Sequence, residues 1–416
     1  MITREQIRKL AGYSYSRGVD IWRQGKIRRF QIKTTKKGRQ IQADVKGSGR
    51  NLYDVRILLD EEEDSVQEAW CDCPAFYSYE GLCKHCTAVL LYYLENPDRQ
   101  IRKQAFEHLY DGYKGFVNTI AAIFDANVRQ AAFFAKERRY TSSLEAALDG
   151  GNIPVSVYTN LVRTVEEHLQ PMYRYLKLRK RLLGVDELHM YDVYVPMVEE
   201  VCMKFSFEEA KTMVKEGLSV LGEEYTGLLE KGFQERWIDI YENEGKRSGA
   251  YSWGAYGTHP YVLLNYQGNL NHVFTLAHEM GHALHSWYSD HNQNYLNAGY
   301  RIFVAEVAST CNEALLIHHL LKKAKDPKNK AYLINYFLEQ FRTTLYRQTM
   351  FAHFEQEMHQ KVEEGGTLTA ETLCNAYYGL NQKYYGEEMI SDKQIRYEWA
   401  RIPHFYTPFY VYQYAT

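Results

Sequence analysis

The sequence has no run of about 18 apolar residues, the length that a membrane-spanning helix needs. Its first residues, Met1 to Arg8, lack the apolar segment of a secretory signal. Neither sign of charge predominates, because 50 Lys and Arg residues oppose 52 Asp and Glu residues, and the mean hydropathy is -0.50. These absences exclude a membrane protein and a disordered chain. They predict a soluble globular protein, with the cytoplasm as its location.

The seven cysteines do not form the pattern of a disulfide framework, since several have metal-ligand spacing and the others are scattered. A chain of 416 residues can bury a substantial core and hold two or three domains.

One stretch, Leu276 to His285, contains the spacing H-E-x-x-H at His278, Glu279 and His282. On a helix the two histidines share one face, so both can reach one metal ion while Glu279 leans over the open coordination position. Zinc with three protein ligands lowers the pKa of a bound water to about 7, and a nearby carboxylate can move that water's proton to a leaving amine. A charged turn of an ordinary helix is the alternative, but the apolar flanking residues favour a buried helix that carries a zinc hydrolase site.

A third ligand is needed, and Glu306 is our candidate because it stands alone in the apolar run Ile302 to Ala308. A lone carboxylate in such a run is costly unless it is paired or bound to a metal. His285 and Glu313 are the competing candidates. A third consecutive ligand on one helix would distort a tetrahedral site, so we expect His285 to support the site or to face the substrate.

The residues from about 98 to 416 resemble the oligoendopeptidase F branch of the thimet-oligopeptidase-like zinc peptidases. The matching stretches are the H-E-x-G-H helix, Glu187 to Asp192, Lys246 to Tyr266, Phe303 to Ser309 and Glu398 to Tyr406. The resemblance implies a mainly α protein, with a helical zincin-type peptidase domain and a short β-containing loop region.

The same resemblance assigns roles to residues. It implies that His278, His282 and Glu306 bind zinc, that Glu279 is the general base, and that His404 and a nearby tyrosine hydrogen-bond the substrate carbonyl and its oxyanion. Two parts of the family pattern are missing from the sequence: the helical N-terminal wall of the substrate channel and the helices that follow the position of Thr416.

Residues 1 to 97 differ in character from the rest. Basic residues predominate before Arg50 and acidic ones after it, with the acidic run Asp60 to Asp64 at the centre of the second part. Alternating apolar residues on both sides of 36–39 predict a two-stranded hairpin. Further strands are expected at 51–59 and 66–71. The hairpin's basic residues are Arg28, Arg29, Lys33, Lys36, Lys37 and Arg39.

The predicted strands lead into the pattern C-x-C…C-x-H, formed by Cys71, Cys73, Cys83 and His85. Four soft ligands suit a closed tetrahedral zinc site, which would stabilise a small α+β module. The pattern and the helical segment 87–93 resemble the SWIM zinc finger. Cys86 is a possible substitute for His85, and a redox pair is the alternative to a structural zinc site.

SWIM modules are associated with nucleic-acid or protein binding, and the basic hairpin would suit a partner of either kind. The hairpin has few interleaved aromatic residues, which argues against base stacking and leaves phosphate contacts. A solvated charged face without a partner is the alternative.

From residue 98 onward, helices are expected at 102–136, 155–183, 207–233, 332–364 and 370–385, with breaks at 149–154 and 364–366. Ser206 and Thr369 are the expected N-caps.

The segment 245–268 is expected to form a loop followed by a short strand at 261–266. An edge strand beside the metal would pair with an extended peptide, and Gly254 and Gly257 would let the loop move or approach the peptide closely. A hairpin without substrate contact is the alternative.

The aromatic stretch from His404 to Tyr412 is the second chemical element. A tyrosine hydroxyl or an imidazole N–H can stabilise the oxyanion that forms during attack on the carbonyl. Tyr410 is our first candidate for this donor and His404 the candidate for carbonyl contact. Tyr406, Tyr412, Gly257 and His285 are the expected substrate-binding residues.

Together these patterns predict a zinc metalloendopeptidase that binds one catalytic and one structural zinc ion and cleaves short unstructured peptides. The alternative is a SWIM-mediated nucleic-acid or protein-binding protein whose truncated peptidase domain is inactive.

Overall fold

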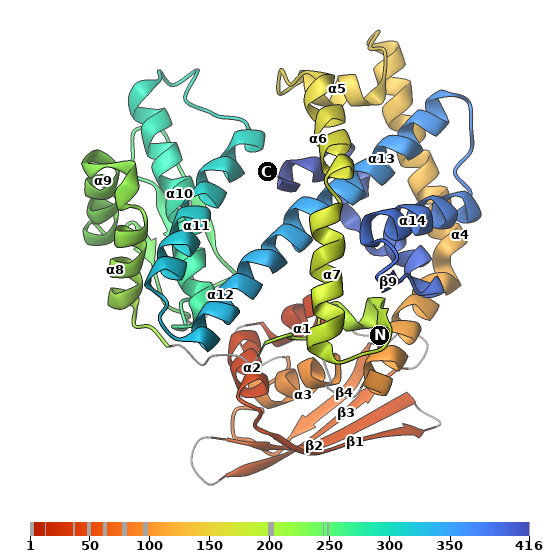
Figure 1. The fold of residues 1–416 in the computed structure, drawn as a ribbon, viewed down its shortest axis with the longest axis vertical. Coiled ribbons are helices and arrows are strands. Elements are labelled where there is room, and N and C mark those ends of the chain that lie inside the picture. Colours follow the sequence, from red (N-terminus) through yellow and green to blue (C-terminus); the bar gives the residue numbers. More distant parts are fainter. Residues whose placement is uncertain are drawn as a thin grey trace. The chain divides into compact units, whose positions relative to one another are not determined.

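The computed structural model describes residues 4–12, 14–35, 38–47, 51–60, 65–76, 81–94, 99–198, 204–243, 245–247 and 249–415 (Figure 1). These residues form two compact units. The first combines Met1–Pro196 with Met350–Tyr410, and the second combines Met197–Thr349 with Val411–Thr416. Within the described residues, no helix is both long enough and apolar enough to cross a bilayer.

The first unit begins with two short helices, α1 (Arg4–Ala11) and α2 (Ser14–Arg23). An antiparallel sheet follows in the order β1-β2-β3-β4. Its strands are β1 (Ile27–Thr35), β2 (Gly38–Lys46), β3 (Leu52–Leu59) and β4 (Val66–Cys71). The predicted hairpin and both further strands are therefore confirmed. Alternate residues of β2 and β3 are buried under α3 (Lys84–Leu94), as the period of a strand requires (Figure 1).

The predicted basic set of the hairpin does not form one free surface. Arg39 is only 8% exposed, and its guanidinium donates to the hydroxyl of Tyr93 at 2.5 Å and contacts the His108 ring at 3.1 Å. Arg29 is paired with Asp44. Lys36 and Lys37 lie outside the described residues, as do residues 61–64 of the acidic run and the expected boundary at 97/98.

The rest of the first unit is mainly helical. Its elements are α4 (Arg99–Glu137), α5 (Ser143–Asp149), α6 (Val155–Glu167), α7 (Gln170–Leu183), β5 (Leu188–His189), η2 (Met190–Asp192), α14 (Ala370–Tyr385), β9 (Met389–Ile390), η5 (Lys393–Arg401), η6 (Pro403–Tyr406) and most of α13 (Arg347–Glu363). Thr369 caps α14 by accepting from the Thr372 N–H, as predicted. The prediction of a single helix over 155–183 is wrong, because two helices, α6 and α7, cover this range. Pro171 opens a new helix there, because its ring is compatible with the first turn but not with a helix interior.

The second unit contains the H-E-x-x-H segment. Its elements are α8 (Phe207–Gly217), η3 (Ser219–Leu221), α9 (Glu223–Gln234), β6 (Ile238–Asp239), β7 (Tyr251–Trp253), β8 (Tyr261–Leu263), α10 (Leu270–Asn292), α11 (Ile302–Lys323), α12 (Pro327–Gln340), a π-helical turn η4 (Phe341–Tyr346) and η7 (Val411–Ala415). Ser206 caps α8 in a reciprocal capping box with Glu209, as predicted.

Three expectations for this part of the chain need correction. The helix expected over 207–233 breaks at Gly222, whose φ of +91° is outside the helical range. The helix expected over 332–364 passes through the π-helical turn. The strand at 261–263 is not an edge strand, because the sheet order β6-β8-β7 places it in the middle and leaves β7 at an edge.

Helices α10 and α11 cross at Gly281. A Cβ atom at this position would lie 2.7 Å from the Ser309 Cα and 2.9 Å from the Ala308 carbonyl oxygen. Real side chains do not approach backbone atoms this closely, so only glycine permits the crossing. A buried amide strengthens it, since the Asn312 side chain donates to the Ala277 carbonyl at 3.1 Å and accepts from the Tyr225 hydroxyl at 3.0 Å.

The first unit buries two titratable side chains on one face of α13. Glu355 is 0% exposed and His359, one turn later, is 1% exposed. Burial raises the pKa of Glu355 well above its usual value and lowers the pKa of His359 to about 4. Burial thus keeps His359 uncharged near neutral pH and favours the uncharged form of Glu355.

We predict that Gly281→Ala destabilises the chain by about 1–3 kcal/mol, because the added methyl group must push two backbones apart. Gly227→Ala is the matched control, since Gly227 lies in α9 and a Cβ there meets no atom within 4 Å. The control should be neutral or slightly stabilising. Urea unfolding of both variants measures the difference, and equal stability would show that the helices do not depend on the crossing.

A second prediction concerns acid stability. His359 stays neutral when folded while the unfolded chain takes up a proton below about pH 6.5, so stability is lost as pH falls from about 6.5 towards 4. Removing this titration in His359→Leu should flatten the pH dependence of the free energy of unfolding by about 3 kcal/mol. The exposed His168→Leu serves as control, and parallel curves for His359→Leu and the parent chain would contradict the prediction.

Candidate functional site

The H-E-x-x-H segment lies within α10, as predicted. The Asn269 side chain caps this helix by accepting from the His272 N–H. Most of the apolar residues of α10 are buried, whereas His278 and His282 are only partly buried. The helix therefore uses its apolar faces for packing and leaves both imidazoles accessible.

Both imidazoles point at one carboxylate oxygen of α11. The Nε2 atoms of His278 and His282 lie 3.4 and 3.6 Å from the Glu306 Oε2 atom, and one ligand atom of each residue lies within 4.8 Å of the others. Ligands around tetrahedral zinc at about 2.05 Å are separated by about 3.3 Å. The donor set and its spacing thus fit one zinc ion.

The premise that pointed to Glu306 is wrong, although the residue lies where it was expected. The run Ile302 to Ala308 is not a buried stretch, because Ile302, Val304 and Val307 are 50%, 41% and 49% exposed. Glu306 itself is partly buried and accepts from the Ser309 hydroxyl at 3.0 Å. The two histidines, and not apolar surroundings, account for a carboxylate at this position.

Glu279 lies next to the cluster with an uncommitted oxygen. Its side chain is 6% exposed, and its Oε2 atom has no hydrogen-bond partner among the described residues. Burial raises the pKa of Glu279 to about 7, with the nearby Glu306 and Glu313 acting in the same direction and His278 opposing them. A carboxylate in this state can accept or release a proton near neutral pH.

Glu313, a competing candidate for the third ligand, takes a different position. Its Oε1 atom lies 2.6 Å from the Nδ1 atom of His278, and its Oε2 atom accepts from the Gln340 amide at 2.6 Å. A carboxylate on this nitrogen fixes the imidazole so that Nε2 faces the metal position. Gln340, the last residue of α12, was missed in the sequence because no local spacing connects it to α10.

His285 lies outside the cluster of three ligands. Its ring stacks on that of Tyr300, with the ring centroids 3.8 Å apart, and the Tyr300 hydroxyl lies 2.8 Å from the Ser286 hydroxyl. Gly254 packs closely against α10, because a Cβ there would lie 2.5 Å from the Ser286 Cβ. Gly257 has a φ of +82° and open space around it, so the conformation of its turn favours glycine.

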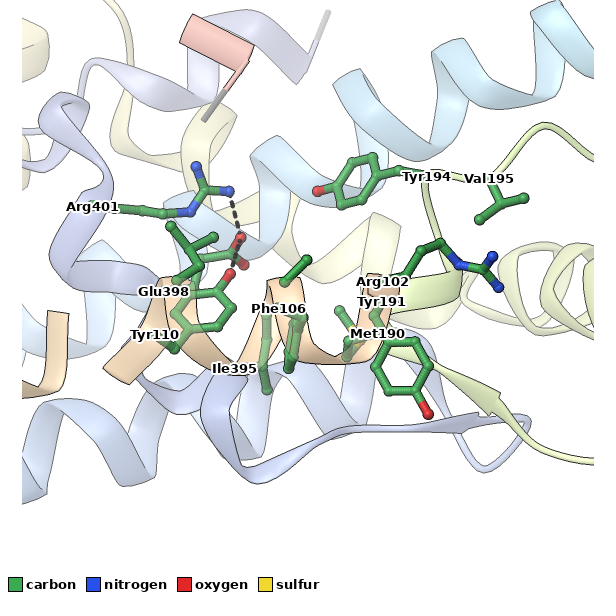
Figure 2. Close-up of a pocket in the computed structure, with 12 residues that line it drawn as sticks. Arg102, Phe106, Tyr110, Met190, Tyr191, Tyr194, Val195, Ile395, Glu398 and Arg401 are labelled. Atoms are coloured by element: carbon green, nitrogen blue, oxygen red, sulfur yellow. Dashed lines mark hydrogen bonds and ion pairs between the residues drawn. The ribbon is translucent and has the colours of Figure 1, made fainter. Parts of the chain in front are cut away.

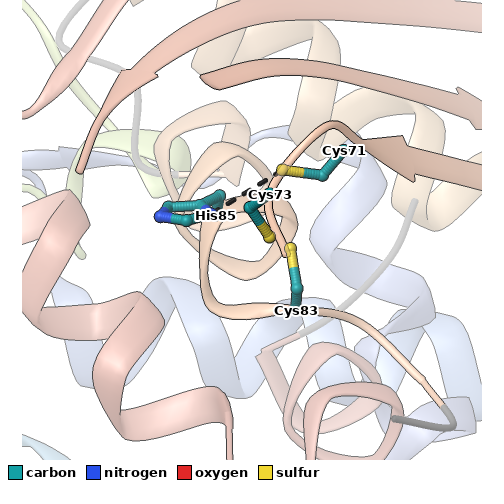
Figure 3. A group of neighbouring side chains, drawn as sticks. All are labelled: Cys71, Cys73, Cys83 and His85. Carbon is teal, nitrogen blue, oxygen red and sulfur yellow. Dashed lines mark hydrogen bonds between the residues drawn. The ribbon is translucent and has the colours of Figure 1, made fainter. Parts of the chain in front are cut away.

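A second cluster lies in the N-terminal part of the first unit. Cys71 ends β4, His85 lies in α3, and Cys73 and Cys83 lie between these elements (Figure 3). All four side chains are nearly fully buried, and their donor atoms lie within 4.8 Å of one another. Hydrogen bonds from Cys71 and Cys86 lower the pKa of Cys83 far below its usual value. A thiolate in a buried set of soft donors fits zinc.

Two further groups surround this second cluster. The Tyr53 ring stacks on His85, with the centroids 4.5 Å apart, so His85 presents Nδ1 to Cys71 at 3.7 Å. Cys86 is fully buried, and its Sγ atom lies 3.7 Å from that of Cys83. Cys86 therefore lies beside the proposed ligands, close enough to be the alternative to His85 that the sequence suggested.

The expected oxyanion residues belong to the first unit, whereas the H-E-x-x-H cluster belongs to the second. His404 and Tyr406 are exposed, and the rings of His404 and Tyr410 lie parallel with centroids 6.3 Å apart. Tyr412 belongs to the second unit, where it is 1% exposed and stacks on Phe303 at 5.7 Å.

A buried carboxylate anchors the segment that carries His404. Glu398 accepts from the hydroxyls of Tyr110 at 3.2 Å and Tyr377 at 2.6 Å, and from the Arg401 guanidinium at 2.8 Å. Figure 2 shows the bonds of Glu398 to Tyr110 and Arg401 at one end of a cavity of about 130 Å³ with mainly aromatic and aliphatic walls. The network fixes η5, and η6 with His404 follows directly.

Comparison with known proteins identifies both parts. The model of peptidase family M3 matches residues 92–416, and the SWIM zinc finger model matches residues 53–94. The chain belongs to peptidase family M3. The two matches imply that it binds zinc, and its mainly helical fold agrees with the prediction.

Curated relatives support this membership. The chain is 47% identical to oligopeptidase PepF of Bacillus subtilis over 375 residues, which cover 90% of the chain and 54% of that protein. It is 46% identical to group B oligopeptidase PepB of Streptococcus agalactiae over 323 residues, or 78% of the chain and 54% of that protein. The chain thus spans about half the length of these relatives.

Solved structures show the same fold. A chain from Chlamydophila abortus aligns with a TM-score of 0.73 and 41% identity, covering 81% of this M3 chain and 56% of the other. Oligoendopeptidase-F from Enterococcus faecium aligns with a TM-score of 0.59 and 39% identity, covering 78% and 51%.

We predict that Glu313→Gln weakens zinc binding at the H-E-x-x-H cluster by about 10- to 100-fold, because an amide supports the His278 ring less strongly than a carboxylate does. Competition with a chromophoric chelator measures this affinity. Glu223→Gln, an exposed carboxylate of the same unit, should bind zinc like the parent chain. Unchanged affinity in Glu313→Gln would show that the 2.6 Å contact does not support the ligand.

Proposed function

We propose that the chain is a zinc metalloendopeptidase that hydrolyses short unstructured peptides. The observation that carries this proposal is the convergence of His278, His282 and Glu306 beside the uncommitted carboxyl oxygen of Glu279. The curated relatives named as oligopeptidases support the substrate class. One catalytic and one structural zinc ion are part of the proposal.

Zinc, when bound by His278, His282 and Glu306, supplies a Lewis acid that acidifies water and polarises the scissile carbonyl. The chain's own residues perform the remaining steps. Glu279 accepts the proton of the attacking water on its free oxygen and later delivers it to the leaving amine. Glu313 holds the His278 ring in one tautomer throughout.

Stabilisation of the oxyanion is assigned to Tyr410, with His404 contacting the carbonyl and Tyr406, Gly257 and His285 as the proposed substrate-binding residues. Tyr412 is not included, because its side chain is buried against Phe303. The exposure of His404 and Tyr406 and the parallel placement of His404 and Tyr410 support this assignment. Removing one such donor typically costs about 100-fold or more in rate.

The buried set of Cys71, Cys73, Cys83 and His85 is the proposed structural zinc site. Its ligands come from a strand end, a loop and a helix start, so a bound metal would hold these three segments together. A domain boundary at 97/98 and a cytoplasmic location remain predictions.

We predict that Glu279→Gln abolishes cleavage of a quenched fluorescent peptide, with a loss of about 1,000-fold or more, because the amide cannot carry a proton. Zinc content should remain at about two ions per chain, since both ligand sets are intact. Fluorescence and elemental analysis of the same samples test both statements. If the parent chain carries both zinc ions but cleaves nothing, the alternative of an inactive peptidase domain with a SWIM-mediated binding function takes precedence.

A further inference from the structure

The segment before Tyr410 forms a tight turn with an unusual residue in it. The Tyr410 N–H donates to the Thr407 carbonyl at 3.2 Å, Pro408 occupies the second position, and Phe409 in the third position has a φ of +56°. These are the features of a type II turn, in which the third residue is normally glycine. A bulky aromatic residue in this conformation is strained and needs compensation from its surroundings.

The compensation comes from α13 and α6. The Phe409 N–H donates to Glu355 Oε1 at 2.7 Å, and both residues are buried. The Phe409 ring lies against His359 at 4.5 Å and edge-on to Tyr158 at 5.6 Å between centroids. Tyr158 in turn donates to the Ala352 carbonyl at 2.7 Å, which ties α6 to the neighbouring α13 (Figure 1).

The carboxyl group of Glu355 has no other hydrogen-bonding task among the described residues. Its Oε2 atom has no partner there, and neither does either ring nitrogen of His359. A purely structural site would favour apolar residues at these two positions, because a buried polar group costs free energy unless it is paired. Accepting the hydrogen bond from the Phe409 N–H is therefore the one polar contact that Glu355 makes among the described residues.

We propose that Glu355 is a positioning residue for Tyr410: by binding the Phe409 N–H it holds the strained turn 407–410 and fixes the direction in which the next side chain leaves the backbone. This inference rests on the proposed function, in which Tyr410 stabilises the oxyanion. Without the bond, the turn relaxes to a negative φ at Phe409, and Tyr410 is displaced.

The first test needs no activity. A fluorotyrosine is incorporated at position 410 of the full chain, and its fluorine resonance is recorded in the parent, Glu355→Gln and Glu355→Leu. The glutamine amide oxygen can still accept from Phe409, so its spectrum should match the parent, whereas the leucine variant should shift or broaden the signal. A resonance unchanged in Glu355→Leu would overturn the proposal. A fluorotyrosine at Tyr140, which bonds Asp149 elsewhere in the same unit, reports any general loss of structure.

The second test uses kinetics. Glu355→Leu should lower kcat by about 10- to 100-fold, as expected for a misplaced catalytic group, with KM changed less than about threefold. Glu355→Gln should keep a kcat close to that of the parent chain. In the Tyr410→Phe background, Glu355→Leu should have no further effect, because two residues that act through one hydroxyl are not additive. Additive losses would show that Glu355 acts through general stability.

The two tests separate the two proposals. A parent chain that cleaves no peptide refutes the proposed function, while the fluorine spectra still decide whether Glu355 sets the position of Tyr410.

Discussion

The close crossing of α10 and α11 is the constraint on which the H-E-x-x-H cluster depends. Two of its proposed ligands come from one helix and the third from the other, so their separation is set by how near the two backbones approach. Gly281 lies between His278 and His282, and it alone allows the contact with Ser309. The buried amide of Asn312 fixes the same crossing one turn from Ser309. Packing and ligand geometry are therefore one property of this helix pair.

Three glutamates around this cluster differ in role because their surroundings differ. Glu306 faces two imidazole nitrogens, Glu313 is bonded on both oxygens, and Glu279 keeps one oxygen free in a buried position. A committed carboxylate can only hold a neighbour in place, whereas an uncommitted one can exchange a proton. The roles proposed for the three glutamates thus follow from their hydrogen bonding and not from residue type.

Features encoded by short spacings could be predicted from the sequence. The i, i+4 histidines, the hairpin at 27–46, the capping residues Ser206 and Thr369 and the buried Cys/His set all depend on neighbours within a few residues or on one compact motif. The central position of β8 could not be predicted, since strand order is a tertiary property. The roles of Gln340 and of the left-handed Phe409 could not be predicted for the same reason, because each is explained only by a partner distant in sequence.

The buried Arg39 has a consequence for the relation between the zinc finger and the peptidase part. It joins a sheet strand to Tyr93 of α3 and to His108 of α4, while Ala105 of α4 belongs to the same apolar core as the finger. The 39-residue helix α4 also carries Tyr110, a donor to Glu398. The zinc finger is therefore packed against the peptidase part and is not joined to it by a linker alone. One helix, α4, thus contacts both the core of the zinc finger and the buried carboxylate that anchors the segment holding His404.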